Sequence, residues 1–260
     1  MIRLVASDID GTLLPHGQSR IDESFFDVID RLEELGVFFA AVSGRQLPSQ
    51  KMLFEKAADK IIFIAENGAL VEYKGETLSE TTMSPALVRE IISDIQRTPG
   101  CEPIVSTKDT VYISRFADEF FRSREKEILY TTTITDDFLS KTEDVLKITA
   151  CKYDGIGGTA SGFYKSWKKF ASVTVSGYMY CDFMEKTVSK GNALGMVMEH
   201  IKVKPEECVA FGDNYNDISM LDKAEFTFAM KHADDEVRAH AMYETDDVER
   251  TVRKIFNLQR

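Results

Sequence analysis

Two aspartates, Asp8 and Asp10, stand two positions apart directly after an apolar segment. Residues 2–6 predict a buried strand that delivers Asp8 to its carboxyl end, the edge at which open α/β sheets bind ligands. Two carboxylates so close together can share one cation while one attacks a substrate and the other moves a proton. Gly11 allows the backbone to turn sharply beside them. The pair is therefore a candidate catalytic centre.

Other polar loops follow apolar segments in the same way. Ser43-Gly44-Arg45 comes after residues 37–42, and the loop from Gly212 to Asp217 comes after residues 208–211. Because strands and helices alternate along the chain, we expect parallel strands covered by helices. Loops that follow such strands meet at one edge of the sheet, where active-site loops belong.

Hydrophobic periodicity and turn residues predict the elements that hold these loops. In the first part of the chain they predict helices over 22–35, capped by Asp22, and from Pro48, strands over 37–42 and 61–65, and a hairpin turning at 73–75. In the middle they predict helices over 84–95, 117–129 and 161–170, strands near 104 and over 111–114, 145–151 and 173–178, and a flexible glycine-rich loop over 154–159. The last part predicts a helix that Lys190 opens, strands over 208–211 and 226–229, and two final helices.

The regular alternation breaks near Thr81 and resumes after Met184. We expect residues 1–81 and 185–260 to form one α/β domain with a mostly parallel sheet. Residues 82–184 are expected to form an inserted α+β domain, since insertion fits ends that lie close together at the splice.

Composition limits the function further. The chain has 260 residues and a formal net charge of −11, which argues against nucleic acid as a partner because binding the phosphate backbone needs clustered Lys and Arg. Four widely spaced cysteines form no Cys-x-x-Cys pair and are expected to be buried apolar residues rather than disulfides or metal ligands. No apolar run approaches membrane length, so we expect a cytoplasmic protein without a membrane partner.

Four motifs resemble, in order, those of the haloacid dehalogenase (HAD) superfamily of phosphotransferases. They are Asp8-Ile9-Asp10-Gly11-Thr12-Leu13, Ser43, Lys190 and the loop Gly212-Asp213-x-x-Asn216-Asp217. The position of the insertion, with residues 66–69, 189–191 and 212–221, resembles the Cof-like phosphatases, whose cap is of the C2B type. This resemblance covers residues 1–81 and 185–260 and implies a Rossmann-like core with an α+β cap.

The resemblance implies a role for each matching residue. Asp8 is the expected nucleophile and Asp10 the acid and base. Mg²⁺ suits an oxygen-only shell of Asp8, the backbone carbonyl of Asp10, and Asp213. The residues expected to hold phosphate or to support the site are Ser43, Gly44, Lys190 and Asn216 for phosphate, with Asp217 supporting Lys190 or the metal's waters. Arg45 is expected either to reach phosphate or substrate or to form a surface salt bridge.

The expected activity is Mg²⁺-dependent hydrolysis of small phosphorylated metabolites, sugar phosphates above all, by a monomer or small homo-oligomer. Two alternatives stay open: a phosphosugar mutase that uses the same Asp8 and Asp10, and a non-catalytic metabolite-binding regulator of this fold. The chain departs from many relatives at Lys231-His232, where they carry Gly-Asn. His232 is expected to be a solvated residue at a helix start, with contact to substrate as the alternative.

Overall fold

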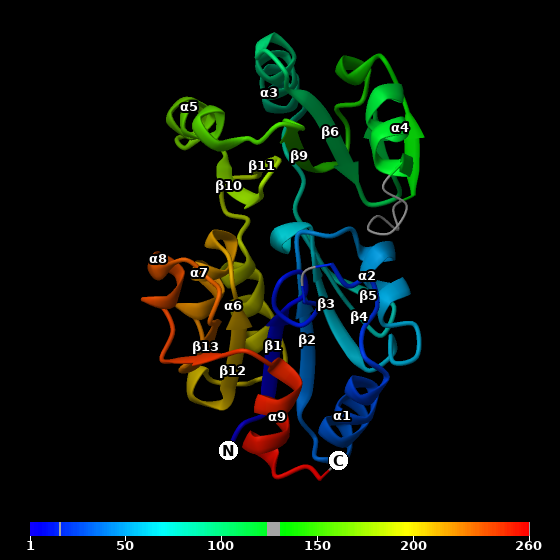
Figure 1. The fold of residues 1–260 in the computed structure, drawn as a ribbon. Helices are drawn as coiled ribbons and strands as arrows, with labels where there is room; N and C mark the ends of the chain where they lie inside the picture. The colour runs from blue at the N-terminus through cyan, green and yellow to red at the C-terminus, as the bar shows by residue number, and fades with distance from the viewer. Residues whose placement is uncertain (16, 124–130, 260) are drawn as a thin grey trace.

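The computed structural model describes residues 1–15, 17–123 and 131–259 (Figure 1). Within these ranges the strands form two sheets, one with eight strands and one with six. The larger sheet lies with both termini at one end of the molecule, and the smaller sheet forms the other end. The long axis of the molecule therefore runs from one sheet to the other.

The larger sheet has the strand order β14-β13-β12-β1-β2-β3-β4-β5. Pairing is parallel from β14 to β3, and β4 and β5 are added antiparallel. The strands are β1 (Leu4–Asp8), β2 (Phe38–Val42), β3 (Ile61–Ala65), β4 (Leu70–Tyr73), β5 (Glu76–Glu80), β12 (Cys208–Gly212), β13 (Phe226–Met230) and β14 (Tyr243–Thr245). The expected α/β fold with a mostly parallel sheet is confirmed.

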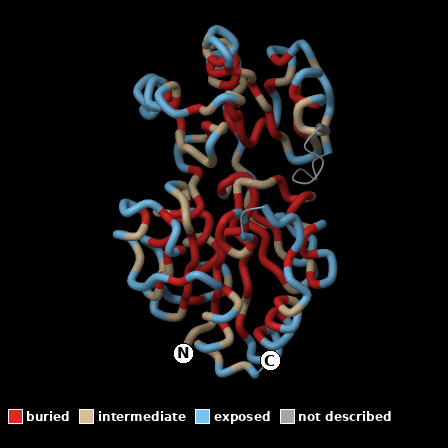
Figure 2. Tube along the Cα trace, viewed as in Figure 1, coloured by how far each residue is buried: buried red, intermediate tan, exposed pale blue. Residues whose placement is uncertain are grey.

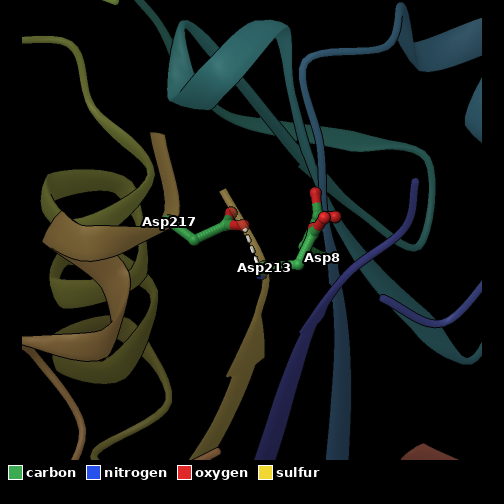
Figure 3. A group of neighbouring side chains, drawn as sticks. All are labelled: Asp8, Asp213 and Asp217. Atoms are coloured by element: carbon green, nitrogen blue, oxygen red, sulfur yellow. Dashed lines mark hydrogen bonds between the residues drawn. The ribbon is translucent and has the colours of Figure 1, made fainter. Parts of the chain in front are cut away.

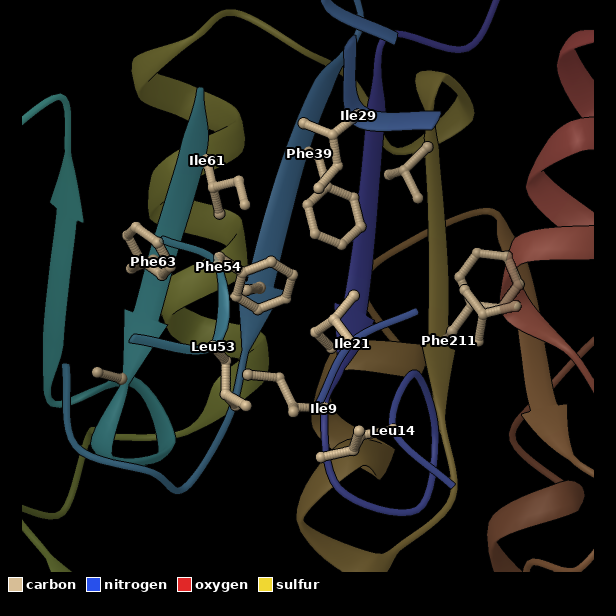
Figure 4. Close-up of a cluster of buried hydrophobic side chains, with 14 of the residues drawn as sticks. Ile9, Leu14, Ile21, Ile29, Phe39, Leu53, Phe54, Ile61, Phe63 and Phe211 are labelled. Carbon is tan, nitrogen blue, oxygen red and sulfur yellow. The ribbon is translucent and has the colours of Figure 1, made fainter. Parts of the chain in front are cut away.

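Helices cover both faces of this sheet, because successive strand residues point to opposite sides and both sides are apolar. Val5 belongs to the core under α1 (Glu23–Glu34), α2 (Leu47–Leu53) and α9 (Val248–Phe256). Its neighbours Leu4 and Ala6 belong to the core under α6 (Lys190–His200), α7 (Ile218–Leu221) and α8 (Asp235–Arg238). Figure 4 shows part of the first core, and Figure 2 shows that the central strands are buried. The larger sheet therefore forms the middle layer of three, with helices packed on both of its faces.

The smaller sheet has the order β10-β11-β9-β6-β7-β8 and is antiparallel except for the pair β7–β8. Its core joins α3 to the sheet through buried aliphatic residues such as Ile91, Val105 and Ile148. The elements are α3 (Pro85–Arg97), β6 (Glu102–Thr107), β7 (Val111–Ile113), α4 (Arg115–Ser123), β8 (Thr132–Ile134), β9 (Val145–Cys151), α5 (Gly157–Trp167), β10 (Ser172–Gly177) and β11 (Tyr180–Met184). Short 3₁₀ turns occur at Glu66–Gly68, Phe138–Ser140, Pro205–Glu207 and Tyr215–Asp217.

Several sequence predictions for the smaller sheet need correction. The glycine-rich stretch 154–159 is not wholly a loop, because α5 begins at Gly157 and ends at Trp167 instead of running over 161–170. The helix predicted over 117–129 begins at Arg115, and residues 124–129 lie outside the described residues. The strand predicted over 173–178 turns at residues 178–179 into β11, which the prediction omitted.

β4 and β5 form the hairpin predicted to turn at residues 73–75. Two other strands that the prediction omitted, β8 and β14, are edge strands. Most of their residues are exposed or half-buried, so they lack the apolar pattern by which a strand is recognised. Cys101, Cys151, Cys181 and Cys208 are buried and unpaired, as expected. Across the described part of the chain, no helix combines the length and apolar character that crossing a membrane requires.

Candidate active site

Three loops meet at the carboxyl edge of the larger sheet because β1 lies between β2 and β12. Asp8 is level with Val42 in the register of β1 and β2, so Ser43 follows one residue beyond it. Ser7 is level with Phe211 in the register with β12, so Asp213 comes just past the same edge. Parallel pairing thus brings together loops that are far apart in the sequence.

Lys190 joins two of these loops through an ion pair on each side. Its Nζ lies 2.6 Å from Asp8 Oδ1 and 2.5 Å from Asp217 Oδ1. The lysine is 1% exposed and begins α6, whose first turn is capped by the Ser189 hydroxyl. Burial lowers the pKa of Lys190, but Asp217 and Asp8 outweigh it and raise the pKa above its usual value. Lys190 therefore stays a cation under the Asp8 carboxylate.

Both carboxylate oxygens of Asp217 already accept hydrogen bonds. Oδ1 accepts from Lys190, and Oδ2 accepts from the backbone N–H groups of Asp213 and Asn214. Gly212 permits this approach, since a Cβ there would lie 2.5 Å from the Cβ of Asp217. The carboxylate of Asp217 therefore fixes the shape of the 212–217 loop and the position of Lys190, in keeping with the supporting role expected from the sequence.

Asp8, Asp213 and Asp217 form a group of carboxylates whose nearest oxygens all lie within 4.8 Å of one another (Figure 3). Burial, followed by the charge of Asp217, raises the pKa of Asp8 well above its usual value and also raises that of Asp213. Thr12 Oγ1 donates to Asp213 Oδ1 at 2.9 Å and fixes that side chain. Lys190 supplies one positive charge to three acids, so the group suits a bound cation. Asp217 accepts three hydrogen bonds at its two oxygens, which makes Asp8 and Asp213 the better candidates to hold it.

Asp10 points its carboxylate toward Arg45. Arg45 Nε lies 2.7 Å from Asp10 Oδ2, and Nη2 lies 2.5 Å from Oδ1. The Asp10 side chain is 49% exposed, whereas that of Asp8 is 7% exposed. Of the two aspartates, Asp10 is thus the one that faces open space. The salt bridge that the sequence left open for Arg45 is present.

A cleft of about 800 Å³ lies between the two sheets. Its lining on the side of the larger sheet comes from Asp8, Asp10, Ser43, Gly44, Arg45 and Asn216. On the other side it is lined by Thr149, Tyr178, Tyr180 and Asp182, among others. The structure therefore brings all the site residues predicted from the sequence to one place, with Lys190, Asp213 and Asp217 beside or beneath Asp8.

The sequence pointed to residues 66–69 but not to the residues of the smaller sheet that meet them at this cleft, which are Lys147, Thr149 and Asp182. Lys147 Nζ lies 2.7 Å from Glu66 Oε2 and 2.5 Å from the carbonyl oxygen of Gly44. Asp182 accepts hydrogen bonds from Asn67 Nδ2 at 2.8 Å and from Thr149 Oγ1 at 2.6 Å. The signal available in the sequence was a charged residue within a largely apolar segment. These residues are Lys147 in β9 and Asp182 in β11.

His232 does not begin a helix, because it lies in the turn between β13 and α8. Its side chain is 47% exposed, as the sequence suggested, but Nε2 lies 3.4 Å from Asp213 Oδ2. His232, where many relatives were expected to carry Asn, thus stands beside the 212–217 loop.

Comparison with known proteins agrees with this site. The haloacid dehalogenase-like hydrolase family matches residues 5–252, so the chain belongs to that family. It is 26% identical over 243 residues to the 5-amino-6-(5-phospho-D-ribitylamino)uracil phosphatase YbjI of Escherichia coli, covering 93% of this chain and 90% of that protein. It is also 26% identical to the phosphoglycolate phosphatase of Staphylothermus marinus over 242 residues, covering 93% and 90% of the two chains.

Among solved structures, the HAD subclass IIB sugar phosphatase BT4131 superposes with a TM-score of 0.81. The two share 20% identity over 99% of this chain and 100% of that one, a level at which the likeness concerns the fold. It confirms the Rossmann-like core with a cap. The chain is a phosphatase of the Cof-like group within the HAD superfamily.

Proposed function

We propose that this phosphatase hydrolyses monoesters of small phosphorylated metabolites, with sugar phosphates as the leading class, through an intermediate on Asp8. The observation that carries the proposal is the position of the Asp8 carboxylate at the cleft, with Lys190 on one side and Asp213 on the other. YbjI and BT4131 act on phosphorylated compounds that carry a sugar or a sugar alcohol, according to their names.

The metal in this proposal is Mg²⁺, held by the carboxylates of Asp8 and Asp213 and the backbone carbonyl of Asp10. Oxygen-only donors are those that Mg²⁺ prefers. When bound, the cation offsets the repulsion between the Asp8 carboxylate and the phosphate. The excess of carboxylates around Lys190, and the raised pKa values of Asp8 and Asp213 caused by burial and Asp217, support a cation here.

The first step forms a bond between an Asp8 oxygen and phosphorus and breaks the bond from phosphorus to the ester oxygen. Asp10 gives a proton to that departing oxygen. In the second step Asp10 takes a proton from water, the water oxygen attacks phosphorus, and the bond to Asp8 breaks. The half-exposed side chain of Asp10 at the cleft is suited to meeting both the alcohol and the water.

The phosphate oxygens are held by Ser43, the backbone N–H of Gly44, Lys190 and the Asn216 amide, with Asp217 positioning Lys190. These donors compensate charge as it moves toward the departing oxygen. We also propose that residues 1–81 and 185–260 act as the catalytic domain and residues 82–184 as the cap that selects substrate. Cytoplasmic location and a monomer or small homo-oligomer remain predictions from the sequence.

The test is phosphate release from a panel of small phosphate esters, with Mg²⁺ and with a chelator. Release that requires Mg²⁺ and favours a subset of sugar phosphates is expected. If no phosphate is released but phosphate is transferred to a second sugar, the protein is a phosphosugar mutase instead of a hydrolase. If a metabolite binds tightly and neither reaction occurs, the protein is a non-catalytic metabolite-binding regulator.

A further inference from the structure

A chain of hydrogen bonds between side chains crosses from the cap to the phosphate site. Asn216 Nδ2 donates to Asn67 Oδ1 at 3.0 Å, and Asn67 Nδ2 donates to Asp182 Oδ2 at 2.8 Å. Asn216 follows β12, Asn67 follows β3, and Asp182 lies in β11 of the smaller sheet. We call these three residues the amide relay. Asn67 and Asp182 are each 1% exposed, so water does not replace these bonds.

The direction of the relay matters because an amide has a donor end and an acceptor end. A phosphate oxygen only accepts, so Asn216 is useful to phosphate when its Nδ2, rather than its Oδ1, is offered to the cleft. With one Nδ2 hydrogen given to Asn67, a second remains. If Asn216 turned over, its Oδ1 would meet the Oδ1 of Asn67, and two acceptors would oppose each other.

Asn67 could relieve that clash only by turning over as well, and Asp182 prevents this. An ionised carboxylate has no hydrogen to give, so the group of Asn67 that faces Asp182 must be Nδ2. Thr149 Oγ1 holds the other carboxylate oxygen at 2.6 Å and keeps Asp182 aimed at Asn67. Lys147 Nζ pairs with Glu66 at 2.7 Å and lies 3.8 Å from Asp182 Oδ2, so Asn67 makes the shorter contact to that oxygen.

The backbone around Asn67 fixes where its side-chain amide lies. Asn67 has φ of 56°, in the left-handed region that Asn tolerates better than most residues, and Glu66 beside it has φ of 50°. The backbone N–H of Asn67 also donates a hydrogen bond to the carbonyl oxygen of Ser43. This strained turn sets the Asn67 amide between the Asn216 amide and the cap.

We propose that Asp182 is a positioning residue of the cap that fixes the donor direction of the Asn216 amide at the phosphate site. The inference rests on the proposed function, because it takes Asn216 as a phosphate donor. Its consequence is reciprocal coupling: a seated cap strengthens phosphate binding, and bound phosphate holds the cap in place.

The probe is inorganic phosphate with Mg²⁺, measured by calorimetry, beside KM and kcat for an ester that the wild type hydrolyses. Asp182→Asn lets residue 182 donate, so both amides can turn over, and phosphate affinity should fall about tenfold, as for the loss of a hydrogen bond to a charged group. Asp94→Asn is the matched control, because it makes the same substitution at a cap carboxylate that accepts a hydrogen bond from Trp167 Nε1 and lies outside the lining of the cleft. Its phosphate affinity should stay close to that of the wild type.

A second variant separates direction from packing. Asn67→Asp alone places a carboxylate against Asp182 and should lower the melting temperature. In Asn67→Asp with Asp182→Asn, residue 67 accepts from both neighbours, so the Asn216 donor direction returns and phosphate affinity should recover. Because the pair restores every hydrogen bond of the relay, it should fold even if Asp182→Asn does not.

Three results would overturn the relay. They are wild-type affinity in Asp182→Asn, equal losses in Asp182→Asn and Asp94→Asn, and no recovery in the double variant. If the wild type hydrolyses esters in any of these cases, the proposed function stands and the relay alone fails. A wild type that neither hydrolyses esters nor binds phosphate would overturn both.

Discussion

The guanidinium of Arg45 contacts both carboxylate oxygens of Asp10, at 2.7 Å from Nε and 2.5 Å from Nη2. A planar fork that meets a carboxylate in this way fixes its plane as well as its position. Asp10 is therefore held in one orientation at the mouth of the cleft, on a side chain that is otherwise half exposed. The same guanidinium lines the cleft.

Replacing Arg45 by Lys should lower kcat about tenfold with little change in melting temperature. Lysine keeps the charge but cannot make the two-point contact that orients Asp10. Stability should hold because a partly exposed ion pair contributes about 1 kcal/mol or less. Steady-state kinetics and thermal unfolding measure the two effects. Arg31→Lys, at the exposed pair with Glu34, is the control and should leave both unchanged. Unaltered kcat in Arg45→Lys would remove Arg45 from the orientation of Asp10.

Asp8→Asn should abolish turnover without lowering the melting temperature in the presence of a chelator. The amide cannot act as the nucleophile but retains an oxygen for Lys190. Burial and the charge of Asp217 raise the pKa of Asp8, which means that its ionised form is disfavoured in the folded protein, so a neutral group costs no stability. Phosphate release and thermal unfolding test both halves. Turnover near that of the wild type would show that another group attacks phosphorus.

Asp217→Asn should destabilise the protein by about 3 kcal/mol and also reduce kcat, because a buried ion pair loses one partner. Lys190 would keep Asp8 but lose its second carboxylate, and the backbone N–H groups of Asp213 and Asn214 would lose a charged acceptor. Denaturant unfolding and kinetics give the two values. Asp222→Asn on the surface, where the carboxylate pairs with His240, serves as the comparison. A stable and fully active Asp217→Asn variant would be incompatible with its supporting role.

Stabilisation by Mg²⁺ should grow with pH. Burial, with Asp217 next, raises the pKa values of Asp8 and Asp213, so the metal-free protein loses stability as pH rises through these values and the carboxylates ionise. Metal binding needs the ionised forms and offsets that loss. The shift in melting temperature caused by Mg²⁺ should therefore be larger at about pH 8 than near the usual pKa of aspartate, about 4. A shift that is independent of pH, or is retained in Asp213→Asn, would argue against this site.

The core and its loops could be predicted because their signals are local. Asp8, Ser43 and Asp213 each follow a run of apolar residues that forms a parallel strand, and the parallel pairing then brings them together. The caps of α1 at Asp22 and of α3 at Ser84 were also readable from single residues. Such features depend on a few neighbours in the chain.

The contacts between the sheets could not be predicted in this way. Asn67 and Asp182 are 115 positions apart, and the sequence around each residue does not indicate that they form a hydrogen bond. The hairpin from β10 to β11 turns at Tyr178 and Met179, two large side chains, and Gly177 alone before them is a weak turn signal. The position of the cap residues in the cleft thus depends on tertiary packing.

The most direct test of the central claim is to look for phosphate on Asp8. The protein would be mixed with Mg²⁺ and a sugar phosphate that it hydrolyses, quenched in acid within one turnover, digested, and analysed by peptide mass spectrometry. We expect a phosphorylated peptide that contains Asp8. Its phosphate should be lost on longer incubation as water attacks the intermediate. Rapid phosphate release with no phosphorylated Asp8 at any time, under conditions that preserve acyl phosphates, would contradict the account.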